Sequence, residues 1–129
     1  MSFAHVSIRT SNMERSISFY QRYFGMRMVS RREIPENNAE IAFLESEGES
    51  FQLELTWYRS QKRFEQAEYE NRTFDHLAFV VTGLDALVSK MKEEGVVVTD
   101  EPFTARATGK RYAFVEDPDG TLIELIERR

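Results

Sequence analysis

A short histidine-containing motif occurs twice in the chain and constrains its fold more than any other feature. Phe3-Ala4-His5-Val6 is echoed by Phe74-Asp75-His76-Leu77, at an offset of 71 residues. These are the only two histidines among 129 residues. A self-similar pattern at a fixed offset indicates that one supersecondary unit has been duplicated. The sequence therefore predicts two copies of the same small fold.

A helix is predicted after each motif. Ser11 and Thr82 each have an acidic residue three positions later, the pattern of a capping box at a helix N-terminus. Apolar residues then recur at helical spacing. They are Met13, Ile17, Tyr20 and Phe24 in the first half, and Leu84, Leu87, Val88 and Met91 in the second. Gly25 and Gly95 follow as residues that can end a helix with a positive φ.

Strand-like segments follow each predicted helix. They are Met26–Ile34, Glu40–Glu45 and Phe51–Trp57, then Val96–Thr99, Lys110–Glu116 and Thr121–Glu127. The expected fold is α+β, with two paired βαβββ modules over about residues 1–58 and 73–129. A polar connector over residues 59–72, predicted as a solvated loop or short surface helix, joins them within a single domain of residues 1–129.

Composition narrows the classes of function. A net charge of −5 argues against a nucleic-acid-binding protein, which needs a basic face. Apolar runs are too short to cross a membrane, and the absence of cysteine excludes disulfides and thiol chemistry. We expect a cytoplasmic enzyme or a small-molecule binder, with no nucleic-acid or membrane partner.

Two histidines and two glutamates form a candidate metal site. Alternation along a strand places His5 on one face with Ser7 and Arg9. Glu124 lies within an apolar strand, where an unpaired carboxylate would be costly, so it needs a partner. His5 precedes Glu54 by 49 residues and His76 precedes Glu124 by 48.

A single histidine or glutamate of this kind is more often an ordinary core or surface residue. The nearly equal spacing of the two pairs favours a shared role. If the halves pack about a pseudo-twofold axis, His5, Glu54, His76 and Glu124 can converge on one centre. Two imidazoles and two carboxylates suit a divalent ion of borderline softness.

Several segments resemble the vicinal-oxygen-chelate superfamily, and within it the glyoxalase I family. They are FAHVSIR, SISFYQRYFGM, LELTW around Glu54, and AFVEDPDGTLIELIE at the C-terminal end. The His-Glu-His-Glu order fits glyoxalase I better than the extradiol dioxygenases and fosfomycin-resistance enzymes, which use three protein ligands. Methylmalonyl-CoA epimerases typically have glutamine at the position of Glu54. Bleomycin-resistance proteins share the fold without a metal site.

The resemblance implies an isomerase that converts the hemithioacetal of methylglyoxal and glutathione into S-lactoylglutathione. A base removes a proton next to a carbonyl, and a metal stabilises the resulting enediolate. Glu124 corresponds to the base, and Glu54 to a ligand that can assist it. The resemblance also favours nickel or cobalt, with zinc possible, and implies a homodimer, with sites either shared between subunits or built within one chain.

Four further positions are implicated in substrate binding by the resemblance. Arg9 matches an arginine that contacts a glutathione carboxylate, and an ordinary surface arginine is the alternative. Lys110 and Arg111 match cationic contacts supplied by a partner subunit, although a surface role is favoured for them. Tyr58 stands where the family commonly has asparagine. Another thiol or a different vicinal-oxygen substrate is therefore an alternative to glutathione.

Two other functions remain open on the sequence. One is another metal-dependent epimerase or isomerase of the same superfamily that forms an enolate. The other is a resistance-type protein that binds a small molecule between its modules. The four-residue set argues against the binding protein, because a pure binder has no need of it.

Overall fold

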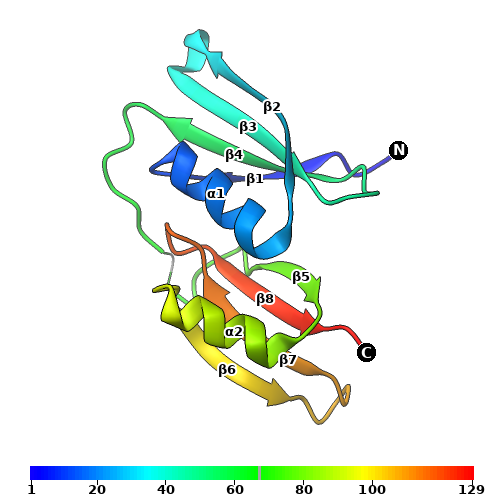
Figure 1. Ribbon diagram of the computed structural model, residues 1–129. Helices are drawn as coiled ribbons and strands as arrows, with labels where there is room; N and C mark the ends of the chain where they lie inside the picture. The colour runs from blue at the N-terminus through cyan, green and yellow to red at the C-terminus, as the bar shows by residue number, and fades with distance from the viewer. Residues whose placement is uncertain (67) are drawn as a thin grey trace. The chain divides into compact units, whose positions relative to one another are not determined.

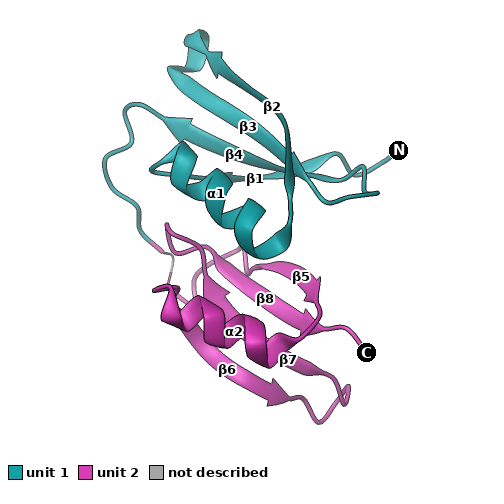
Figure 2. Cartoon of the chain, in the orientation of Figure 1, with its two compact units in different colours: residues 1–65 teal, residues 66–129 magenta. Residues whose placement is uncertain are grey.

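Each half of the chain folds into a four-stranded sheet with one α-helix (Figure 1). This computed structural model describes residues 1–66 and 68–129. The chain divides into two compact units, unit 1 (residues 1–65) and unit 2 (residues 66–129) (Figure 2). The predicted α+β class and the βαβββ order of both halves are confirmed.

The elements of the two units correspond one to one, except for a short 3-10 helix in unit 1. Unit 1 contains β1 (His5–Arg9), α1 (Met13–Phe24), β2 (Arg27–Ile34), η1 (Pro35–Asn37), β3 (Ala39–Glu45) and β4 (Gln52–Tyr58). Unit 2 contains β5 (Leu77–Val81), α2 (Leu84–Glu93), β6 (Val98–Thr104), β7 (Arg111–Glu116) and β8 (Leu122–Glu127).

The first and last strands of each unit are neighbours. The strand orders are β1-β4-β3-β2 and β5-β8-β7-β6. Strands β1 and β4 pair in parallel, as do β5 and β8, whereas the other pairs are antiparallel. In unit 1, β1 carries His5 and is hydrogen-bonded to β4, which carries Glu54. In unit 2, β5 directly follows His76 and is hydrogen-bonded to β8, which carries Glu124.

One face of each sheet is buried, and the opposite face carries the predicted site residues. Alternate side chains of the central strands are fully or almost fully buried together with apolar residues of the helix. In unit 1 these include Tyr20, Leu44, Leu53 and Leu55, and in unit 2 Leu84, Met91, Ile123 and Leu125. The histidine and glutamate side chains lie on the opposite face, because they alternate with these core residues.

The predicted helix starts are wrong by one residue. Asn12 rather than Ser11 caps α1, since its Oδ1 accepts from the backbone N–H of Arg15 at 3.0 Å. Before α2, Gly83 takes a left-handed conformation (φ 65°) without a side-chain cap, so Thr82 is not the capping residue. The chain leaves both helices as predicted, with Gly25 at φ 62° and Gly95 at φ 87°.

Strand β6 differs most from its prediction. It covers Val98–Thr104 rather than Val96–Thr99, although it contains Pro102. Proline cannot donate to a neighbouring strand, but β6 is an edge strand with irregular register, where that donor is not required. The other strands agree to within about two residues.

The described residues between 59 and 72 contain no helix or strand, as the loop interpretation predicts. Neither α-helix of the described chain has the length and hydropathy of a membrane span.

An ion pair between α2 and β7 predicts an acid-sensitive contribution to stability. Arg111 donates to both carboxylate oxygens of Asp85, at 2.5 and 3.0 Å, and these bonds lower the pKa of that carboxyl. The folded-state pKa thus lies below the unfolded value of about 3.9. The stabilisation is present above about pH 4 and is lost as pH falls through the folded-state pKa.

We therefore expect Asp85→Asn to lower the free energy of unfolding near neutral pH and to reduce its loss on acidification. Urea unfolding followed by circular dichroism, between about pH 6 and pH 3, measures both effects. Glu93→Gln on the same helix is the control, since Glu93 has no ion pair among the described residues. Identical pH dependence in Asp85→Asn and the unchanged chain would contradict the expectation.

Candidate metal and substrate site

Unit 1 brings its predicted histidine and glutamate together. His5 begins β1, and its Nε2 lies 3.9 Å from Oε1 of Glu54 on β4. Ser7 is the register partner of Glu54, so the histidine lies diagonally across the parallel pair. The glutamate side chain is 16% exposed and the histidine 41% exposed. The two donor atoms can therefore both be reached by a ligand on this face.

Unit 2 repeats this arrangement. His76 directly precedes β5, and its Nε2 lies 3.7 Å from Oε1 of Glu124 on β8. Ala78 is the register partner of Glu124, again two residues after the histidine. The same diagonal recurs at an offset of 71 residues for the histidines and 70 for the glutamates, so the duplication extends to the side chains of the site.

A phenylalanine packs edge-on against each histidine, a feature that we did not predict. The ring centroids of His5 and Phe43 are 5.2 Å apart, and those of His76 and Phe114 are 5.8 Å apart. Phe43 pairs with Glu54 across β3 and β4, and Phe114 pairs with Glu124 across β7 and β8. Phe43 and Phe114 are 71 residues apart, as the two histidines are, so a search for further matches at that offset would have found them.

One histidine also has a carboxylate partner. Asp75 Oδ1 lies 2.6 Å from Nδ1 of His76, and this hydrogen bond lowers the pKa of the Asp75 carboxyl. An ionised carboxylate can only accept, so Nδ1 is the donor in this hydrogen bond, while Nε2 faces Glu124. Residue 4, at the corresponding position in unit 1, is alanine.

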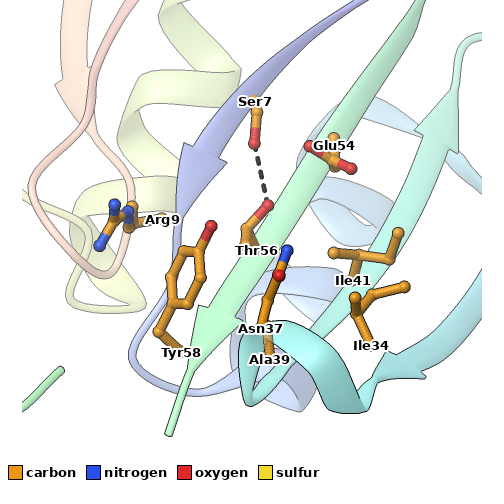
Figure 3. Close-up of a pocket in the computed structure, with 9 residues that line it drawn as sticks. All are labelled: Ser7, Arg9, Ile34, Asn37, Ala39, Ile41, Glu54, Thr56 and Tyr58. Atoms are coloured by element: carbon orange, nitrogen blue, oxygen red, sulfur yellow. Dashed lines mark hydrogen bonds between the residues drawn. The ribbon is translucent and has the colours of Figure 1, made fainter. Parts of the chain in front are cut away.

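A pocket of about 440 Å³ opens on the exposed face of the unit 1 sheet (Figure 3). Glu54 and Ile41 lie along one part of it, and Arg9 and Tyr58 along another (Figure 3). Between them, the hydroxyls of Ser7 and Thr56 are hydrogen-bonded at 2.9 Å. The remaining lining residues are Ile34, Asn37 and Ala39. This pocket combines a carboxylate, a guanidinium and neutral polar groups on an apolar wall.

In unit 2, the sheet face that carries Glu124 is more apolar than the corresponding face of unit 1. Val80 is 54% exposed, and Phe103 stacks on Phe114 with ring centroids 6.5 Å apart. Tyr112 contacts Phe103 at 6.0 Å between centroids. Ile126 flanks Glu124 two residues along β8, where unit 1 has Thr56 beside Glu54. The two glutamates therefore have different surroundings.

The predicted substrate-binding residues occupy different environments. Arg9 and Tyr58 line the unit 1 pocket, with the Arg9 Cζ atom 4.3 Å from the Tyr58 ring centroid. Arg111 is held by Asp85 and lies 3.5 Å from Glu127. Lys110 is exposed and has no ion pair among the described residues. Roles for Lys110 and Arg111 in substrate binding stay predictions.

Within the described residues, no group of three or more histidine, aspartate or glutamate side chains gathers to hold a metal. Each unit by itself offers two donors, one imidazole nitrogen and one carboxylate oxygen. Convergence of all four on a single ion stays a prediction.

Comparisons with known proteins agree with the fold. Residues 2–125 match the Glyoxalase/Bleomycin resistance protein/Dioxygenase superfamily. A lactoylglutathione lyase of Haemophilus influenzae is 35% identical over 131 residues, which cover 100% of this chain and 94% of that protein. A lactoylglutathione lyase of Arabidopsis thaliana is 36% identical over 98% of this chain, which spans only 44% of that relative.

Solved structures show the same architecture. The crystal structure of a V278E mutant of glyoxalase I from Zea mays superposes with a TM-score of 0.82 at 29% identity, covering 98% of this chain and 44% of the maize chain. The match to the superfamily covers almost the whole sequence and is joined by full-length similarity to a bacterial relative. The chain belongs to the glyoxalase/bleomycin resistance protein/dioxygenase superfamily.

Proposed function

We propose that this chain is a metal-dependent isomerase of the glyoxalase I type. It would convert the hemithioacetal of methylglyoxal and a thiol, glutathione in the first instance, into the S-lactoyl thioester. The observation that carries the proposal is the duplicated histidine–glutamate pair, with donor atoms 3.9 and 3.7 Å apart on equivalent strands. The lactoylglutathione lyases among its relatives support this reaction.

The donor set fits a divalent metal ion. Imidazole nitrogen and carboxylate oxygen bind zinc at about 2.0–2.2 Å, so two donors on one tetrahedral ion lie about 3.3 to 3.6 Å apart. The donor atoms of the two histidine–glutamate pairs, 3.9 and 3.7 Å apart, are slightly wider than this and would have to approach a little to share an ion. Neither glutamate accepts a hydrogen bond from another described side chain, so each carboxylate is free to bind a cation.

We infer that His5, Glu54, His76 and Glu124 together hold one ion per chain. Family resemblance favours nickel or cobalt, and mixed nitrogen and oxygen ligands are compatible with either. The proposal also includes a homodimer located in the cytoplasm.

Asp75 supports the role of His76 as a ligand. Its hydrogen bond fixes the ring orientation and keeps the proton on Nδ1, which leaves Nε2 for the ion. Ligating histidines commonly have such an acceptor behind them. His5 has no carboxylate at this position, so we expect His76 to be the better-oriented ligand of the two.

The reaction requires a base and a place for negative charge. A divalent ion held by the histidines and glutamates would supply electrostatic stabilisation of the charge that develops as the proton leaves. Glu124 is the candidate base, because its surroundings on β8 and β7 are apolar and offer the carboxylate few competing donors. Glu54, beside the hydroxyls of Ser7 and Thr56, is the more suitable permanent ligand.

The pocket of unit 1 suits the thiol part of the substrate. Arg9 can bind a carboxylate with its planar fork of donors, and Thr56, Asn37 and Tyr58 line the space between it and the wall of β3. Isoleucines at positions 34 and 41 supply the apolar surface. A peptide-like thiol with a terminal carboxylate matches these groups.

Glu124→Gln tests the base directly. The amide cannot accept the proton, so we expect kcat for S-lactoylglutathione formation to fall at least about 100-fold. Part of the bound metal should remain, because three ligands are unchanged. The assay follows the thioester from methylglyoxal and glutathione, after removal of metal and separate reconstitution with nickel, cobalt or zinc.

Glu127→Gln is the matched control. It replaces a glutamate by glutamine on the same strand, β8. The Glu127 side chain lies near Arg111, on the sheet face opposite to the candidate site. Full activity of Glu124→Gln would remove Glu124 as the base. Absence of turnover with every divalent ion in the unchanged chain would overturn the proposed reaction.

Asp75→Ala is expected to weaken metal binding about ten-fold or more, because the His76 ring loses its acceptor. Competition with a chromogenic chelator measures the dissociation constant without relying on turnover. Glu93→Ala on α2 is the control, since it removes one negative charge from unit 2 at a residue with no ion pair among those the structure describes. Equal affinities in Asp75→Ala and the control would show that Asp75 does not support the ligand.

A further inference from the structure

The Arg9 guanidinium is held in place by neutral groups. Its Cζ atom lies over the Tyr58 ring, 4.3 Å from the centroid, and its Nη1 donates to Gln61 Oε1 at 3.2 Å. Gln61 is itself oriented, because its Nε2 donates to the backbone oxygen of Arg63 at 3.1 Å. The ring restrains one face of the guanidinium, and the amide fixes its direction in the plane.

Two other arginines of the chain are held by carboxylates instead. Arg31 is held by Glu14 and Glu40, and Arg111 contacts Asp85 and Glu127. Their charges are compensated by two carboxylates each. Arg9 has no carboxylate partner among the described residues. It therefore presents a positioned but uncompensated positive charge, with most of its five N–H donors unused.

We propose that Tyr58 and Gln61 position Arg9 so that the unit 1 pocket selects thiol substrates that carry a carboxylate. The inference rests on the proposed function and deepens it. Tyr58 is thus a positioning and specificity residue that acts through Arg9.

The geometry of the pocket limits where that carboxylate lies. Arg9 is two residues beyond Ser7, the register partner of Glu54, which places it about 7 Å further along the strand. Arg9 and Glu54 line the same pocket, and their side chains are drawn on the same face of the sheet (Figure 3). A suitable substrate has its reacting carbons near Glu54 and its carboxylate roughly that far away.

The cation–π contact between Arg9 and Tyr58 predicts which side chains can replace tyrosine at position 58. The attraction comes from the ring face and does not need the hydroxyl, so phenylalanine should largely replace tyrosine and leucine should not. A planar guanidinium also stacks better than an ammonium, so lysine at position 9 should be a poor substitute.

Binding of S-methylglutathione and of its diethyl ester tests the proposal. Neither probe has a free thiol, and only the first carries carboxylates. Isothermal titration with the chain as purified would compare Tyr58→Leu, Tyr58→Phe, Arg9→Gln and the double variant Arg9→Gln/Tyr58→Leu. Arg59→Gln is the control, because Arg59 stacks on Trp57 at 5.1 Å and does not line the pocket.

We expect Tyr58→Leu to weaken S-methylglutathione binding about two- to five-fold, the range of an exposed cation–π contact. Binding of the ester should be unchanged, Tyr58→Phe should behave like the original chain, and the double variant should bind no worse than Arg9→Gln. In turnover, Tyr58→Leu should raise KM with little change in kcat. Arg59→Gln should change none of these quantities.

Three results would overturn the inference. They are equal weakening of acid and ester by Tyr58→Leu, additive losses in the double variant, and no binding of S-methylglutathione to the original chain. The binding cycle does not depend on chemistry. Carboxylate-dependent binding through Tyr58 without any isomerase activity would therefore reject the proposed reaction and leave this inference intact.

Discussion

Parallel pairing of the first and last strands of each unit is the constraint on which the candidate site depends. It places His5 diagonally opposite Glu54, and His76 diagonally opposite Glu124, although about fifty residues separate the members of each pair. Parallel neighbours need a long crossover, and in each unit the helix and two further strands provide it. Burial of one sheet face under the helix then leaves the histidine and glutamate on the other.

Duplication provides two similar pairs, and later divergence gives them different surroundings. Around Glu54 lie hydroxyls, the amide of Asn37 on η1 and Arg9, whereas around Glu124 lie Phe114, Ile126 and exposed Val80. The first setting suits recognition of a polar substrate. The second suits a carboxylate that takes up a proton, because apolar side chains surround it. This difference in surroundings is why we assign the two glutamates different tasks.

Much of the fold followed from the sequence, because periodicity and duplication reinforce one another. The repeated order of elements and both helix-ending glycines were predictable, and so were the two histidine–glutamate pairs. Asn12 as the cap and the extent of β6 were not, because several polar residues can cap a helix and an edge strand tolerates proline. The contacts of Arg9 with Tyr58 and Gln61 depend on side-chain rotamers and tertiary approach, which strand alternation does not determine.

The central claim is that both histidine–glutamate pairs bind the same ion. X-ray absorption spectroscopy of the nickel-loaded chain, with metal content measured on the same sample, tests it most directly. We predict one ion per chain with two imidazole ligands, and the loss of one imidazole in His5→Ala and likewise in His76→Ala. A spectrum with a single imidazole that His5→Ala leaves unchanged, or a chain that retains no ion, would contradict the account.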